Sequence, residues 1–313
     1  MVADHRRSLA ARRVLITGGT SGIGLATAQQ LTDAGARVIL LARGEAGLDD
    51  AASRLGGAAT VSADVGNAAE LNAAAAEAAG VFEGLDAVIA NAGAASYGPF
   101  TESSVGDYEQ TIRTTLLGMI ITAHAALPHL EQTGGQLVVV GSVAGRLPTP
   151  WLSSYAAAKH GVRGFVRSLA CELTAQGIPV DLALVAPGPV DTPFWQRART
   201  PDGRLPPELR GVYDADEVAG EVMRALRGAG SLERTVGALF APAIILDTLI
   251  PNLLLRPLGI AARLGWRARE DRPSSGGDGF AKPMASARRS GELSSRRSLL
   301  RHTRSVLSPR ARP

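Results

Sequence analysis

Short runs of hydrophobic residues alternate with longer alanine-rich stretches over residues 12 to 230. This alternation predicts strands followed by helices, the pattern of a parallel sheet. The predicted strands are 13–17, 37–41, 58–62, 87–91, 136–141 and 179–185, and the clearest predicted helices are 23–34, 70–79, 105–130 and 155–176. Several strands, such as Leu137 to Val140, are continuous apolar runs, so helices should cover both faces of the sheet. The pattern predicts one α/β domain with a doubly wound parallel sheet, over about residues 10–265.

Two segments depart from this alternation. Residues 235–255 form an apolar segment that is long enough to span a membrane, but Pro242, Asp247 and Pro251 interrupt it. A lid over a substrate, or an apolar helix lying on a surface, is therefore favoured over a span for 235–260. Residues 271–313 are rich in Ser, Arg, Gly and Pro, which predicts a disordered tail.

The net charge of +4 is unevenly distributed. Residues 281–313 contain nine Lys or Arg and the single acid Glu292, which leaves 24 basic and 28 acidic residues in the rest of the chain. The folded part is thus mildly acidic, and no nucleic-acid partner is expected. Apolar area beside a basic tail is typical of weak, salt-sensitive contact with anionic membranes, here through residues 235–313, and deletion of 271–313 should abolish that contact. A solvated tail beside a lid is the alternative.

Cysteine and histidine are sparse. Cys171 is the only cysteine, and the five histidines do not stand at metal-ligand spacing. No disulfide and no metal site are expected, and a reducing cytoplasm is the default location. The basic N-terminal residues run directly into a glycine-rich motif, so no cleavable signal peptide is predicted.

The glycine-rich motif stands between the first predicted strand and the first predicted helix. It comprises Thr17-Gly18-Gly19-Thr20-Ser21-Gly22-Ile23-Gly24. Glycines at such a junction permit a tight turn and close approach of the backbone to a pyrophosphate, which the helix N-terminus attracts. A merely structural turn is the alternative, but the position after a strand favours a Rossmann-type dinucleotide site.

The spacing of this motif resembles that of the short-chain dehydrogenase/reductase family. Further marks follow in the family's order over residues 10–230: Asp64-Val65, Asn91-Ala92-Gly93, Ser142, Tyr155 with Lys159, and Pro187-Gly188-Pro189-Val190-Asp191-Thr192. The resemblance implies an oxidoreductase with a nicotinamide cofactor. It also implies that Asp64 and Val65 meet the adenine, that Asn91, Ala92 and Gly93 line the adenosine side, and that Thr192 meets the nicotinamide carboxamide. Pro187, Gly188 and Val190 belong to the same implied cofactor site.

The residue after the second strand selects between NAD and NADP. NAD-binding folds place an acid there, whereas Ala42 is followed here by Arg43. A guanidinium pairs with a 2′-phosphate through two parallel donors, which favours NADP(H). An exposed loop charge, partly neutralised by Glu45, is the alternative reading of Arg43.

Tyr155 and Lys159 are four residues apart in a predicted helix, so they share one face. A phenol with a pKa near 10 needs a lower pKa to act as acid and base at neutral pH. One cation about 4 Å away, in an effective dielectric of about 20, stabilises the phenolate by about 4 kcal/mol, which is enough to lower the pKa into that range. The alternative is that Tyr155 and Lys159 are a structural pair on an amphipathic helix, without a catalytic role. Ser142 ends a buried strand shortly before Tyr155, and its hydroxyl can share a substrate oxygen, which favours a catalytic role for all three residues.

Thr115 departs from the family pattern. The family usually has an asparagine three residues before a glycine in the preceding helix, where it holds a water that relays protons to the lysine. Thr115 occupies that place before Gly118. A hydroxyl has one hydrogen-bond donor, whereas an amide has two. The relay of protons through a bound water to Lys159, and with it turnover, is therefore in question.

The loops after the fifth and sixth strands carry apolar side chains, which predict a hydrophobic ketone or alcohol as substrate. They are Val143, Ala144, Leu147, Trp151, Phe194 and Trp195. Core or subunit contacts are the alternative, and we expect a homo-oligomer. Two rival functions stay open from the sequence: a cofactor-binding regulatory protein with little catalysis, and a membrane-surface protein.

Overall fold

The computed structural model of the chain describes residues 8–206, 211–228, 232–237, 240–267, 284 and 286–290. A parallel sheet of seven strands forms its centre, in the order β3-β2-β1-β4-β5-β6-β9. The strands are β1 (Arg13–Thr17), β2 (Arg37–Ala42), β3 (Ala59–Ser62), β4 (Ala87–Ala90), β5 (Gln136–Val140), β6 (Asp181–Pro187) and β9 (Glu233–Val236). The order reverses between β1 and β4, and in such sheets ligands bind beyond the carboxyl ends of the strands at that point.

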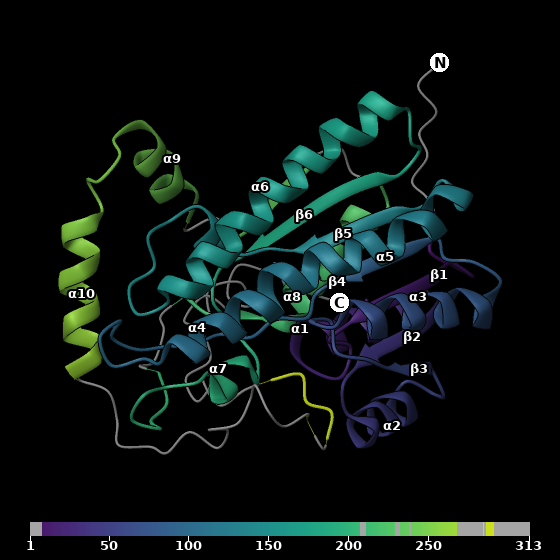
Figure 1. Cartoon of the computed structure of the whole chain (residues 1–313), viewed down its shortest axis with the longest axis horizontal. Helices are drawn as coiled ribbons and strands as arrows, with labels where there is room; N and C mark the ends of the chain where they lie inside the picture. The colour runs from purple at the N-terminus through teal and green to yellow at the C-terminus, as the bar shows by residue number, and fades with distance from the viewer. Residues whose placement is uncertain are drawn as a thin grey trace, which may run out of the picture.

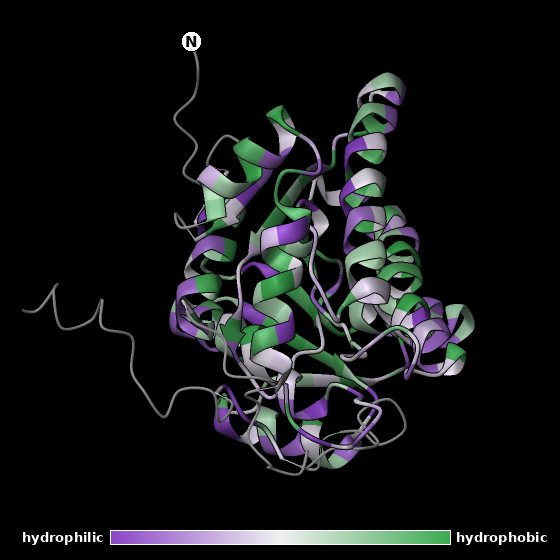
Figure 2. Ribbon diagram, turned by 90° about the vertical axis from the view of Figure 1, so that its left-hand side faces the viewer, coloured by the Kyte–Doolittle hydropathy of each residue, from purple (hydrophilic) through white to green (hydrophobic). Residues whose placement is uncertain are grey.

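Helices cover both faces of the sheet (Figure 1). One layer contains α1 (Gly22–Asp33), α2 (Glu45–Arg54) and α8 (Ala215–Leu226), and the other contains α3 (Ala68–Phe82), α4 (Val105–Ile112), α5 (Gly118–Thr133) and α6 (Ser153–Gln176). Along β1, Val14 and Ile16 pack toward the first layer and Leu15 toward the second. Figure 2 shows the resulting hydrophobic strands between helices with polar outer sides. The predicted doubly wound α/β fold is confirmed.

The predicted elements differ from the observed ones in three places. The helix predicted at 105–130 contains a π-helical turn, η1 (Arg113–Leu117), between α4 and α5. Residues 233–236, which overlap the segment predicted as apolar lid, form β9 and pair with β6. Short elements near the strand ends had no signal in the periodicity; they are η2 (Val143–Gly145), β7 (Val190–Asp191), α7 (Phe194–Arg197) and β8 (Tyr213–Asp214).

Two further helices follow β9 at one end of the domain. They are α9 (Ala241–Leu249) and α10 (Leu255–Arg267), which lie beyond the start of α6 in Figure 1. Among the described residues no helix has both the length and the hydrophobicity to cross a membrane.

The predicted disordered tail, 271–313, lies outside the described residues except for Met284 and 286–290. This piece lies against the domain. Ala287 is 1% exposed and its N–H donates to Asp50 Oδ2 at 2.6 Å. The hydrogen bond from Ala287 and the bond from Arg54 lower the pKa of Asp50.

Candidate active site

The glycine-rich turn between β1 and α1 leaves no room for side chains. A Cβ on Gly24 would lie 2.3 Å from the carbonyl oxygen of Gly18, and Gly18 itself has φ of +66°. The amide of Asn91 donates to the carbonyls of Thr17 at 3.0 Å and of Gly18 at 3.2 Å. The sequence thus needs glycine at these positions, and Asn91 holds the turn from the end of β4.

The loop after β6 packs directly on this turn. A Cβ on Gly22 would lie 2.9 Å from Cβ of Thr192, whose side chain is 5% exposed. On the outer side, the N–H of Gly22 donates to the carbonyl of Arg288 at 2.8 Å. The start of α1 therefore contacts both the β6 loop and the described piece of the C-terminal region.

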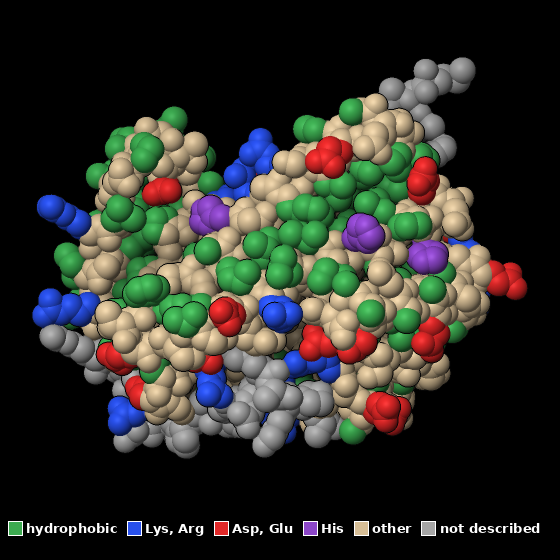
Figure 3. Space-filling view, viewed as in Figure 1, with side chains coloured by type: hydrophobic (Ala, Val, Ile, Leu, Met, Phe, Trp, Pro, Cys, Tyr) green, Lys and Arg blue, Asp and Glu red, His purple; other side chains and the backbone are tan. Residues whose placement is uncertain are grey.

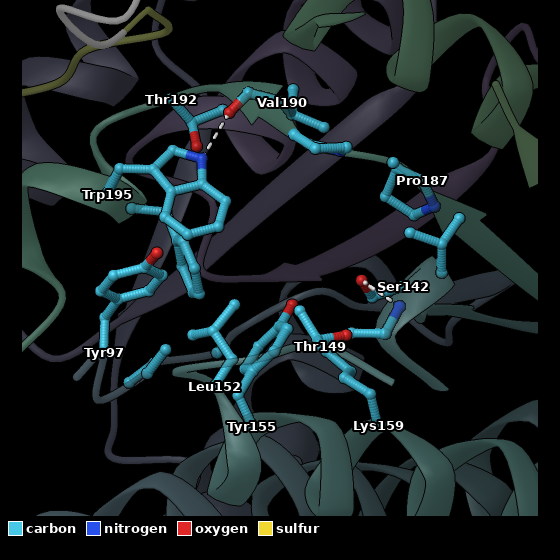
Figure 4. A pocket seen from close by; sticks show the side chains of 18 of the residues that line it. Tyr97, Ser142, Thr149, Leu152, Tyr155, Lys159, Pro187, Val190, Thr192 and Trp195 are labelled. Carbon is cyan, nitrogen blue, oxygen red and sulfur yellow. Dashed lines mark hydrogen bonds between the residues drawn. The ribbon is translucent and has the colours of Figure 1, made fainter. Parts of the chain in front are cut away.

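Ser142, Tyr155 and Lys159 meet at the wall of one cavity (Figure 4). Ser142 follows β5, where its hydroxyl accepts from the N–H of Ala144 at 3.1 Å and lies close enough to Tyr155 to lower the pKa of the phenol. Lys159, one turn after Tyr155 on α6, is 4% exposed. Its ammonium donates to the carbonyl of Val140 at 2.8 Å and lies 5.7 Å from the centroid of the Tyr155 ring. The three side chains predicted to act together are thus brought together.

Burial sets the pKa of both groups on α6. It raises the pKa of Tyr155 to about 12, and the nearby Ser142 hydroxyl opposes this only in part. Burial also lowers the pKa of Lys159 to about 7. The sequence predicts a lowered pKa for Tyr155, so the direction found here is the opposite. The reason is that the ammonium is bonded to a backbone carbonyl and is itself destabilised by burial, so its charge does not offset the loss of water around the phenol.

Thr115 lies in the π-helical turn η1 and is fully buried. Its hydroxyl donates to the carbonyl of Ala94 at 2.7 Å and accepts from the N–H of Ala94 at 3.0 Å. These bonds connect the helix to the chain after β4. A water could use only the remaining lone pair of this oxygen. A relay role for Thr115 stays a prediction.

Replacing Thr115 with valine should lower the free energy of unfolding by about 1–3 kcal/mol, because both Ala94 groups lose a buried partner. Urea denaturation measures this. The control is Thr114→Val, a half-buried neighbour whose hydroxyl accepts only from Gln110 at 3.1 Å, with an expected loss under about 0.5 kcal/mol. Equal losses in the two variants would contradict the anchoring role. A tenfold or larger fall in kcat of folded Thr115→Val would instead place the hydroxyl in proton transfer.

Three of the residues predicted for the adenosine end, Arg43, Asp64 and Val65, do not line the cavity. Arg43 pairs with Asp64 at 3.6 Å, and Asp64 accepts from the N–H of Gly66 at 2.8 Å. Arg197 of α7 was missed by sequence reasoning, yet it lines the cavity. Burial, and then the charge of Arg43, hold the pKa of Arg197 below its ordinary value. Two guanidinium groups that are far apart in the sequence are therefore close enough to repel one another.

Fourteen of the predicted site residues line the cavity, which has a volume of about 480 Å³. They are Gly18, Ser21, Gly22, Ile23, Asn91, Ala92, Gly93, Ser142, Tyr155, Lys159, Pro187, Gly188, Val190 and Thr192. The others do not line it: Thr17, Thr20, Gly24, Arg43, Asp64, Val65 and Thr115. Thr17 supports the turn instead, because its hydroxyl accepts from the N–H of Asn91 at 3.0 Å.

The wall opposite the glycine turn is apolar and aromatic. Phe194 packs 5.5 Å from the Tyr155 ring, and Trp195 donates to the carbonyl of Val190 at 3.0 Å. Tyr97 and Trp266, which had no motif to identify them, stack 6.0 Å apart. The predicted substrate residues Val143, Ala144, Trp151, Phe194 and Trp195 line the cavity. Leu147 does not; it packs behind Val143 with Ile244 of α9.

Comparison with known proteins agrees with this geometry. The family model described as short chain dehydrogenase matches residues 12–203. The chain is similar to the uncharacterized oxidoreductase YxnA of Bacillus subtilis, with 30% identity over 77% of this chain and 69% of that protein. It is also similar to cis-4-hydroxycyclohexanecarboxylate dehydrogenase of Sinomonas cyclohexanicum, with 35% identity over 69% of this chain and 86% of that protein.

Solved structures show the same fold. A short-chain type dehydrogenase/reductase from Mycobacterium marinum superposes with a TM-score of 0.65 at 22% identity, covering 77% of this chain and 99% of that one. Levodione reductase superposes with a TM-score of 0.63 at 26% identity, covering 73% and 96%. The family match spans more than half of the chain and includes the glycine turn, Ser142, Tyr155 and Lys159. The chain belongs to the short-chain dehydrogenase/reductase family of oxidoreductases.

Proposed function

We propose that this protein transfers a hydride between NADP(H) and a carbonyl or alcohol of a hydrophobic substrate, with Tyr155 as general acid and base. Members of the family use NAD or NADP. The observation that carries the proposal is that the hydroxyls of Ser142 and Tyr155 share one cavity with the glycine turn. A proton donor and a dinucleotide-binding turn on facing walls are what carbonyl reduction requires.

The residues around the turn fit a nicotinamide dinucleotide. Gly18 and Gly22 of the turn line the cavity and carry no side chain, so the backbone at these positions can approach a pyrophosphate. Arg43, Asp64 and Val65 would hold the adenosine end, and Thr192 would hold the carboxamide. When bound, the cofactor supplies or accepts the hydride, and its oxidised ring carries a positive charge.

The chain's own groups move the proton. In reduction, Ser142 and Tyr155 donate hydrogen bonds to the substrate oxygen, and the Tyr155 proton passes to that oxygen as its carbon receives the hydride. In oxidation the same proton returns to the phenolate. Lys159, near the Tyr155 ring, stabilises the phenolate once its ammonium is charged. The raised pKa of Tyr155 keeps the phenol protonated at neutral pH, which is the form that donates.

Arg43 and Arg197 support NADP(H) over NAD(H). Arg197 is held below its ordinary pKa partly by Arg43, so an anion between the two guanidinium groups would relieve their repulsion. A 2′-phosphate is such an anion. Asp64 already pairs with Arg43, so the phosphate has to compete with this carboxylate.

The cavity wall favours an apolar substrate. Tyr97, Leu152, Phe194 and Trp195 are among the residues that line it. The name of the Sinomonas relative specifies an alcohol on a cyclohexane ring that also carries a carboxylate. A hydrophobic ring ketone or alcohol is therefore the substrate class we propose, for a homo-oligomeric enzyme in the cytoplasm.

A panel of hydrophobic ring ketones, assayed by NADPH absorbance, tests the proposal. We expect oxidation of NADPH well above the rate without ketone, and little reaction with sugars. The cofactor-binding regulatory alternative would be favoured if the protein binds NADPH but neither reduces any of the ketones nor oxidises the matching alcohols with NADP⁺.

A further inference from the structure

Helices α9 and α10 each have two chemically distinct sides. The inner side of α10 forms part of the cavity wall. Leu258, Ala261, Ala262 and Gly265 of α10 line it. The indole of Trp151 donates to the carbonyl of Ala262 at 3.1 Å, which fixes α10 against the domain. Trp266 adds to this attachment by packing 5.3 Å from Trp151.

The outer side of the same helices is hydrophobic and exposed. In the described part of the chain twelve large hydrophobic side chains are exposed, and eight of them lie within residues 245–264. We name these eight the outer apolar surface: Ile245, Leu246, Leu249, Ile250, Leu253, Leu255, Ile260 and Leu264. Figure 3 shows hydrophobic side chains gathered over α9 and α10. Such a concentration in one short stretch marks an interaction site.

Basic residues accompany this surface. Arg256 and Arg263 are exposed on α10 and stand on either side of Ile260 in the sequence. Residues 248–267 contain no acid, and Asp247 on α9 is only partly exposed. Figure 3 shows Lys or Arg side chains at the outer edge of α10. Apolar side chains interleaved with arginines are the chemistry that recognises an anionic lipid surface.

A second copy of the chain fits this surface less well. In a symmetric dimer the same patch faces itself, so Arg256 and Arg263 would meet the same cations of the other copy with no acid among residues 248–267 to pair them. An anionic bilayer offers both the apolar phase and the negative charge.

We propose that the outer apolar surface docks on anionic membranes and places the cavity beside the bilayer. One helix, α10, then contacts lipid on its outer side and substrate on its inner side. A hydrophobic substrate can pass from the bilayer to Tyr155 without crossing water. The docking stands on its own, whereas the delivery of substrate rests on the proposed function.

Co-sedimentation of the full-length protein with lipid vesicles tests the docking. We expect pelleting with phosphatidylcholine vesicles containing roughly a third phosphatidylserine, and little with phosphatidylcholine alone. Pelleting should fall strongly between about 0.1 M and about 1 M salt, because the Debye length shortens from about 10 Å to about 3 Å. No pelleting with the anionic vesicles at the lower salt would overturn the proposal.

Two double variants separate the contributions. Ile260→Glu with Leu264→Glu, and Arg256→Glu with Arg263→Glu, should each reduce the bound fraction at least about tenfold, since both apolar contact and charge are needed. The matched control is Val81→Glu on α3, which is 48% exposed and should bind like the native protein. Equal loss in the control would overturn the proposal. The proposal would also be overturned if light scattering shows that the native protein is a dimer and that the Ile260→Glu, Leu264→Glu variant is a monomer.

NADPH binding keeps the two proposals distinguishable. All variants should bind NADPH as the native protein does, because none of the substituted residues lines the cavity. Vesicle binding without turnover on any ketone would leave the docking intact and contradict the proposed function. Turnover on a water-soluble ketone without vesicle binding would support the proposed function and contradict the docking.

Discussion

Tyr155→Phe should lower kcat by about 10² to 10⁴ while the Kd for NADPH changes less than about twofold. The substitution removes one hydroxyl, the group that lies near Ser142 at the cavity. The ring stays packed 5.5 Å from Phe194, so the wall of the site is unchanged. Steady-state NADPH oxidation gives kcat, and a fluorescence titration gives the Kd.

Tyr97→Phe is the matched control, because Tyr97 lines the same cavity and is 4% exposed. Its kcat should fall less than about fivefold if the effect belongs to the Tyr155 hydroxyl rather than to any phenol in the wall. Lys159→Ala should reduce both kcat and NADPH affinity. Residual activity of Tyr155→Phe above about a tenth of native would contradict the assignment of Tyr155 as the acid and base.

Local sequence signals predicted the fold and most of the site. Each strand is a run of apolar residues that reports its own burial, and six of the seven sheet strands were predicted within about two residues. The glycine turn was identified because Gly18, Gly22 and Gly24 stand at fixed spacing between a strand and a helix. Tyr155 and Lys159 were expected to lie together because i and i+4 share one face of a helix and because the order of motifs resembles that of the family; both lie on α6 and line the cavity.

Features that depend on contacts between distant segments were not predictable. The pKa of Tyr155 follows from how deeply α6 is covered, which no spacing encodes. The two hydrogen bonds between the Thr115 hydroxyl and Ala94, 21 residues away, had no signal in the sequence. Arg197 is the last residue of the short helix α7, and only the packing of that helix brings its charge close enough to Arg43 to be affected by it. Tyr97 and Trp266 likewise meet through tertiary packing alone.

Arg43→Asp should reverse the cofactor preference of the protein. The native chain should bind NADPH more tightly than NADH, because charge-assisted bonds from Arg43 to a 2′-phosphate contribute about 1.5–3 kcal/mol, or roughly 10- to 100-fold in Kd. Aspartate at this position repels the phosphate and accepts from a ribose hydroxyl, so NADPH binding weakens and NADH binding strengthens. Calorimetry with both cofactors measures the four dissociation constants.

Two further variants decide whether the effect is local. Arg54→Asp makes the same charge change on the exposed end of α2, where Arg54 pairs with Asp50, and should leave the preference unchanged. Arg197→Ala should weaken NADPH more than NADH if both guanidinium groups face the phosphate. Equal affinities for NADPH and NADH in the native protein would contradict the role of Arg43. In that case its ion pair with Asp64 at 3.6 Å would be the stronger competitor for the guanidinium, and the 2′-phosphate would gain nothing from it.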